Sequence, residues 1–130
     1  MPHLRPSSVL SGHAAEEQVV QHLLASGWVV LARRLRIGHL EVDVLAQKGD
    51  VVAIVEIRGR RVSSWVSPMD SVRHGGKRAK LARAARALWA SRFASDPSVR
   101  TLRIDVASVV YGPQGSHVEI APGAIDAAQY

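Results

Sequence analysis

The sequence contains no cysteine among its 130 residues, which excludes disulfide bonds and thiolate metal sites and suits a reducing compartment. Its first stretch, MPHLRPSSVLSGHAAEEQ, has no apolar segment of the kind that a secretory signal peptide carries, so no such signal is expected. No run approaches the roughly 18 apolar residues of a membrane span. These absences predict a cytoplasmic protein with no membrane partner.

Several catalytic signatures are also missing. The six histidines show no metal-ligand spacing such as H-E-x-x-H, and the sequence has neither a glycine-rich phosphate loop nor a nucleophile elbow. The serines of VSSWVS have no identifiable His–Asp support, which argues against a serine nucleophile. No internal repeat, low-complexity tract or linker is found, and the length suits a single domain over residues 1–130.

Apolar residues and positive charge are abundant. Hydrophobic residues make up 47% of the chain, which excludes a disordered tail. The 17 basic residues outnumber the 11 acidic ones and leave a formal net charge of +6. This balance favours an anionic partner, of which nucleic acid is the commonest.

Hydrophobic periodicity predicts two helices and four or five strands. The first helix is expected from Ser7 or Ser8 to about Ser26, where SGW breaks it. The second helix is expected at about 77–93. Strands are expected at about 28–36, on either side of QKGD, over VRTLRIDVASVVYG and over SHVEI. This order predicts an α/β fold in which helices flank a sheet.

The segment EVDVLAQKGDVVAIVEIRGR sets charged residues into what is otherwise typical of a buried β-hairpin. Side chains alternate along a strand, so Glu41 and Asp43 are expected on one face, with the valines at positions 42 and 44 on the other. Glu56 and Arg58 likewise share a face of the second strand.

The turn decides how the two strands meet. With GD as a two-residue turn, Asp43 falls opposite Glu56, whereas with KG as the turn Glu41 does. Both registers predict that all the carboxylates lie on one face, and a bulge or an odd-length loop would separate them.

Opposed carboxylates on a half-buried sheet repel each other, and burying them unpaired would cost several kcal/mol or force protonation. One interpretation is a solvated face with cross-strand ion pairs. The other is a nearby cation, either Arg58 or a hard divalent ion such as Mg²⁺ held by one or two carboxylates and water. The apolar residues on both faces of the second strand argue against simple solvation.

A further carboxylate belongs to the first helix. Glu16 lies near the middle of an apolar stripe, whereas Glu17 is about 100° away towards the polar side. This predicts an inward-facing Glu16; the alternative is that its stem snorkels or that it favours the helix N-terminus. The stripe consists of Ala15, Val19, Val20, Leu23 and Leu24.

The second helix is basic. Lys77 lies four residues before Leu81 on the apolar stripe, so it is expected to point along the sheet, whereas Arg83 and Arg86 project to the opposite side. These outer arginines form either a solvated face or contacts with phosphate, and Arg33, Arg34 and Arg36 add basic charge near strand ends. In the later strand, Arg103 and Asp105 share a face and predict a structural ion pair.

Together these motifs resemble the YraN-like family, small uncharacterised bacterial proteins assigned to the PD-(D/E)XK, restriction-endonuclease-like superfamily, whose members include Holliday-junction resolvases. The resemblance covers roughly residues 10 to 110. Each motif is weak alone, but five in the right order with suitable gaps are fairly specific. The matching stretches are GHAAE (12–16), LEVDVLA (40–46), VEIRGR (55–60), Lys77 and RIDV (103–106).

The resemblance implies an αβββαβ core with a mixed sheet and a metal-dependent nuclease acting on DNA, branched or structured DNA included, with DNA favoured over RNA. Asp43 and Glu56 would bind Mg²⁺ or Mn²⁺, Glu16 would support the metal or its waters, and Glu41 would be secondary. The protein would act as a monomer or a homodimer. The residues expected to hold nucleic acid are Lys77, Arg60, Arg61, Arg78 and Lys80.

The chain departs from the family pattern at three places. Leu40 stands where the family has glycine, one extra residue precedes Lys77, and Arg58 replaces the signature lysine. That lysine orients or activates the attacking water and stabilises the transition state. Arginine supplies charge and binds phosphate bidentately, but it cannot lose its proton near neutral pH. The alternative function is therefore a catalytically impaired nucleic-acid-binding module of the same fold.

Overall fold

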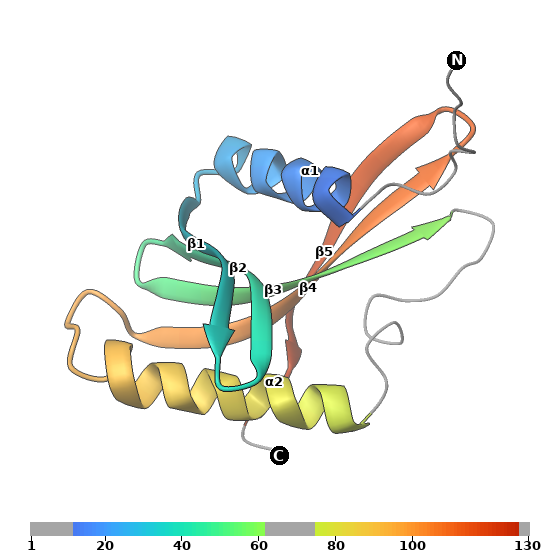
Figure 1. Cartoon of the computed structure of the whole chain (residues 1–130). Coiled ribbons are helices and arrows are strands. Elements are labelled where there is room, and N and C mark those ends of the chain that lie inside the picture. Colours follow the sequence, from blue (N-terminus) through green and yellow to red (C-terminus); the bar gives the residue numbers. More distant parts are fainter. Residues whose placement is uncertain (1–11, 62–74, 128–130) are drawn as a thin grey trace.

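The computed structural model describes residues 12–61 and 75–127, which form one five-stranded sheet between two helices (Figure 1). The expected α/β class and αβββαβ order are confirmed, with one more strand at the end. The expected start of the first helix, at Ser7 or Ser8, lies outside the described residues. The elements are α1 (Gly12–Ala25), β1 (Val29–Ile37), β2 (Leu40–Lys48), β3 (Val51–Arg61), α2 (Gly75–Leu88), the π-helical turn η2 (Trp89–Phe93), β4 (Thr101–Gly112) and β5 (Gly115–Ile125).

The sheet is mixed, and its strands lie in the order β1-β2-β3-β4-β5. Only the central pair, β3 and β4, is parallel; the other neighbours are antiparallel. Parallel neighbours need a crossover connection, which contains α2. None of the described helices has the length and apolarity that a membrane crossing requires.

Each helix covers one face of the sheet, as Figure 1 shows. On the α1 side, Val19 and Leu23 pack with Val55 of β3 in one buried cluster. On the α2 side, Leu81 packs with Ile54 in the other. The predicted apolar stripes are therefore confirmed, except that Leu24 is 47% exposed, because it lies at the edge of the α1 stripe.

The β2–β3 turn is Gly49–Asp50, because Lys48 pairs with Val51. Gly49 has a φ of 61°, in the left-handed region that favours glycine. Of the two registers considered, the one that aligns position 43 with position 56 is thus correct. The paired ladder nevertheless ends at Val44 and Val55, and the β1–β2 hairpin departs from β3 beyond that point (Figure 1).

The outer hairpin also changes face where it leaves the sheet. Val42 packs in the α2-side cluster and Val44 in the α1-side cluster, so the prediction that they share a face is wrong. On the paired strand, Arg33 lies opposite Val44 and Leu35 opposite Val42, and Arg34 between them has a φ of 55°. This left-handed residue interrupts the regular alternation of side chains in β1, directly across from the switch in β2.

Candidate functional site

Asp43 lies where β2 and β3 separate. Its Oδ2 accepts a hydrogen bond from the main-chain N–H of Ile57 at 2.8 Å. The side chain also lines a pocket of about 190 Å³ on the α1 side of the sheet. The residues around this pocket are Gly12, Ala15, Glu16, Asp43, Ile57, Gly59 and Tyr111. Asp43 and Glu16 are thereby brought to one pocket, as expected.

Glu56 is the most deeply buried carboxylate of the candidate site, with 1% of its surface exposed. Its Oε2 lies 2.6 Å from Nη2 of Arg58 and 3.4 Å from Nζ of Lys77. Lys77 reaches Glu56 from the first turn of α2, which is the inward direction predicted from its place on the helix stripe. Two cations therefore converge on one carboxylate oxygen.

The charges of this cluster act on one another. Burial raises the pKa of Glu56, and the negative charge of Asp43 raises it further, whereas Arg58 and Lys77 oppose the shift. Burial likewise raises the pKa of Asp43 against the hydrogen bond from Ile57 and the same two cations. The negative charge of Glu16 adds to the shift at Asp43. The two cations and the hydrogen bond from Ile57 therefore offset only part of the effect of burial on these two carboxylates.

Glu16 faces inward, as predicted, but it is held by partners that the sequence did not reveal. Its two carboxylate oxygens accept hydrogen bonds from Nε of Arg33 at 2.7 Å and from Nε of Arg34 at 2.9 Å. Burial alone would raise the pKa of Glu16, but these two arginines outweigh it and hold the pKa below its ordinary value. Regular alternation would have sent neighbouring arginines to opposite faces, so no sequence pattern predicted this arrangement.

The expectation that all the hairpin carboxylates share one face is wrong. Glu56 lies on the α2 side with Lys77, whereas the pocket that Asp43 lines is on the α1 side. Glu41 is exposed opposite Arg36, and no ion pair within residues 12–61 and 75–127 joins it to the cluster. The reason is the change of face in the outer hairpin, which places Asp43 between the two sides of the sheet.

The remaining cations expected to hold nucleic acid are spread more widely. Arg60 pairs with Glu119 of β5 at 3.0 Å, a partner not foreseen from the sequence. Lys80 is exposed on α2 and Arg78 is half-buried there, while the side chain of Arg61 lies outside the described part. Their contacts with nucleic acid stay predictions.

The predicted ion pair in β4 is confirmed. Nε of Arg103 lies 2.9 Å from Oδ1 of Asp105, which is 2% exposed. The same oxygen accepts a hydrogen bond from the main-chain N–H of Gly123 in β5. Asp105 therefore joins two neighbouring strands and belongs to the framework of the sheet.

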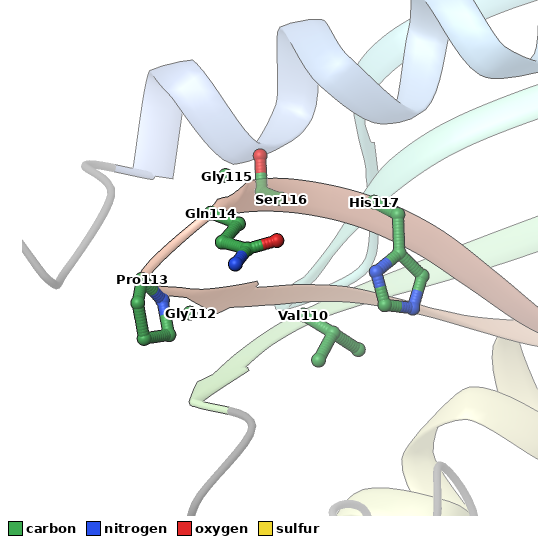
Figure 2. A pocket seen from close by; sticks show the side chains of 7 residues that line it. All are labelled: Val110, Gly112, Pro113, Gln114, Gly115, Ser116 and His117. Carbon is green, nitrogen blue, oxygen red and sulfur yellow. The ribbon is translucent and has the colours of Figure 1, made fainter.

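A second hollow, of about 370 Å³, lies at the β4–β5 turn (Figure 2). No carboxylate lines it, and His117 is its one titratable lining residue. The imidazole of His117 also contacts Glu119 at 2.8 Å. This hollow lacks the paired acidic oxygens found around Asp43 and is not the candidate site. Its lining residues are Val110, Gly112, Pro113, Gln114, Gly115, Ser116 and His117.

The donor set determines which metal the site suits. In the described part of the chain, no three His, Cys, Asp or Glu side chains are grouped so that they alone would hold a metal ion. Asp43 and Glu56 offer carboxylate oxygens, and burial raises the pKa of both groups by disfavouring their charged forms. Mg²⁺ is commonly bound through one or two carboxylates with water and phosphate completing its shell. The residues fit that mode and do not fit an all-protein cage.

Comparison with known proteins gives consistent matches. The model of uncharacterised protein family UPF0102 matches residues 15–109. A UPF0102 protein of Sorangium cellulosum is 43% identical over 114 residues, covering 87% of this chain and 78% of that relative. One of Myxococcus xanthus is 39% identical over 116 residues, covering 89% of each chain.

Among solved structures, SfsA of Pyrococcus furiosus in complex with Ca²⁺ matches with a TM-score of 0.39 and 13% identity. The match covers 85% of this chain and 61% of that one. This chain thus spans less than two thirds of the length of SfsA.

Proposed function

We propose a function for this chain, which belongs to uncharacterised protein family UPF0102, the YraN-like family that its motifs resemble. It is a nuclease-like protein that uses a divalent cation to act on DNA. One observation carries the proposal. Where two strands separate, half-buried Asp43 raises the pKa of buried Glu56, and Glu56 pairs with Arg58 and Lys77.

Each residue has a role that its contacts support. Asp43 and Glu56 would hold the ion, and the N–H of Ile57 orients the Asp43 carboxylate. Arg58 and Lys77, which now share one oxygen of Glu56, would turn to the oxygens of an incoming phosphate and stabilise the charge that develops there. When bound, Mg²⁺ lowers the pKa of an attached water and neutralises charge on the scissile phosphate.

A second function has its own supporting observation. Arg58 occupies the signature lysine position and lies 2.6 Å from Glu56, and arginine cannot give up its proton near neutral pH. A protein that binds DNA at this site but no longer cleaves it would keep the same charges. Cleavage assays therefore have to accompany metal binding.

The test of the cation site is a titration with Mn²⁺, followed by calorimetry or by the electron paramagnetic resonance signal of free Mn²⁺. We expect Asp43→Asn to weaken uptake by about tenfold or more, which is about 1.4 kcal/mol. Asp50→Asn is the matched control, because it removes an exposed carboxylate at the opposite end of the same hairpin. Absence of uptake in the unaltered protein would leave a salt-bridged hairpin and overturn the proposal.

The test of chemistry uses branched, single-stranded and duplex DNA with Mg²⁺ or Mn²⁺. Cleavage that disappears in Asp43→Asn and survives in Asp50→Asn would support a nuclease. Ion uptake and DNA binding without cleavage of any of the three substrates would support the binding module instead.

A further inference from the structure

We propose that Arg33 and Arg34 together form a binding site for a phosphate group of the nucleic-acid backbone, and that Glu16 is the residue that positions them. This arginine pair lies on β1, outside the carboxylate cluster. The inference rests on the proposed function for the identity of the ligand, but the arrangement of the two arginines around Glu16 does not depend on a metal ion.

The arginine pair is built in an unusual way. Nε of Arg33 bonds one oxygen of Glu16 and Nε of Arg34 bonds the other. Neighbours in a regular strand point to opposite faces, and these two reach one carboxylate because Arg34 adopts a φ of 55°. A left-handed backbone is costly for a residue with a side chain, and such strain concentrates at functional sites.

Burial decreases from the Glu16 carboxylate outward to the two arginine side chains. The side chain of Glu16 is 10% exposed, whereas those of Arg33 and Arg34 are 41% and 43% exposed. Glu16 therefore fixes both guanidinium groups from inside and leaves their outer edges facing solvent. Guanidinium offers five N–H donors in a planar fork, so an arginine held at Nε still has donors for a second anion.

The outer edges now carry partners that a phosphate can replace. Nη2 of Arg33 bonds Glu17 at 2.9 Å, and the Glu17 side chain is 54% exposed. Nη2 of Arg34 contacts the imidazole of exposed His13. Exposed ion pairs contribute little to stability, whereas arginine–phosphate contacts are strong and often bidentate.

The position suits a strand of nucleic acid that also reaches the carboxylates. Glu16 and Asp43 line the same pocket, so the arginine pair lies next to the proposed cation site. A strand whose scissile phosphate is at Asp43 would present another phosphate to Arg33 and Arg34. Because both oxygens of Glu16 are taken by arginine, its part in this scheme is to position them.

The test measures DNA binding by fluorescence anisotropy in EDTA, without metal or cleavage, as salt is varied from about 50 to 200 mM. Each lost phosphate contact lowers the magnitude of the negative slope of log K against log salt by about 0.7 on single strands and 0.9 on duplex. Arg33→Gln with Arg34→Gln should lower it by about 0.7 to 0.9, because the pair binds one phosphate. Arg92→Gln, which removes an exposed arginine at the far end of α2 and η2, should change it much less.

Two neighbouring carboxylates provide the sharper comparison. Removing any negative charge tightens DNA binding by general electrostatics, so Glu17→Gln should tighten it. Glu16→Gln should weaken it, because the arginines lose the group that holds them in place. Tightening by both variants, or equal slopes for the double arginine variant and Arg92→Gln, would overturn the proposal.

Two further measurements distinguish loss of the phosphate site from misfolding of the variant and from a site for free phosphate. If the double glutamine variant does not fold, as judged by circular dichroism, Arg33→Lys with Arg34→Lys keeps the charges and removes the forks, and should still weaken binding. Inorganic phosphate should compete only weakly, since it lacks the neighbouring backbone charges, and strong competition would identify a free-phosphate site instead. Mn²⁺ uptake, measured without DNA, reports on Asp43 and Glu56 alone.

Discussion

Asp43 accepts a hydrogen bond from the main-chain N–H of Ile57 just beyond the last paired residues of β2 and β3. A side-chain oxygen thereby gives this N–H a partner where the ladder of main-chain hydrogen bonds has stopped. The separation of the strands leaves room for the pocket that Asp43 and Glu16 line.

Arg58→Lys tests whether the departure from the signature limits catalysis. Lysine keeps the charge beside Glu56 and can transfer a proton, so we expect Mn²⁺-dependent DNA cleavage to rise by at least about tenfold, since proton transfer contributes 10² or more. Arg58→Gln is the control, because it removes the charge without supplying an acid or base. Equal cleavage by all three proteins, or none by any, would count against a weakened nuclease.

The pH dependence of stability tests the buried carboxylates. Burial raises the pKa of Asp43 and Glu56 in the folded protein above the ordinary, unfolded value, so the folded state holds their protons more tightly. Without metal, the free energy of unfolding should therefore fall as pH rises from the ordinary carboxyl pKa through the raised folded values. Urea unfolding in EDTA should show this fall, and the Asp43→Asn, Glu56→Gln double variant should reduce it.

Glu16 contributes with the opposite sign. Its pKa is lowered by Arg33 and Arg34 in spite of burial, so its stabilisation is present above the ordinary glutamate pKa and is lost as pH falls through the lowered value. Glu16→Gln should remove this loss of stability at low pH.

For the pair of Asp43 and Glu56, the contradicting outcome is a double variant whose free energy of unfolding follows that of the unaltered protein at every pH. That result would contradict the proposed burial effect.

Asp105→Ala should destabilise the fold by about 3–5 kcal/mol, because it leaves Arg103 without its carboxylate partner and the N–H of Gly123 without an acceptor. Denaturant unfolding measures this loss. Asp50→Ala, at an exposed turn, should cost about 0.5 kcal/mol or less. Mn²⁺ uptake should be unchanged in folded Asp105→Ala, and a loss of uptake would show that Asp105 belongs to the cation site.

Much of the site could be predicted because the relevant signals are local. Lys77 was placed inward by its spacing from Leu81, and Lys77 does contact Glu56. The sequence limited the hairpin to two registers, and the one with the Gly49–Asp50 turn is observed, with Gly49 in the left-handed region. The Arg103–Asp105 pair followed from alternation in a strand whose pairing with β3 is continuous over those residues.

The contacts that could not be predicted join distant parts of the chain. Arg60 and Glu119 meet only because β5 folds back beside β4 and aligns with the end of β3. Arg33 and Arg34 both reach Glu16 only because Arg34 adopts a left-handed backbone conformation, which an arginine at that position does not predict. The same local distortion separates Val42 from Val44 and moves Asp43 between the two faces.

The sequence by itself determined the order of helices and strands, the apolar faces that bury them and the residues available for chemistry, because periodicity and turn preference act over a few neighbouring residues. Only the tertiary structure decided where β2 and β3 part, which side of the sheet each carboxylate occupies and which arginines hold Glu16. Those outcomes depend on packing and charge pairing between residues far apart in the chain, and a one-residue change in backbone conformation is enough to redirect them.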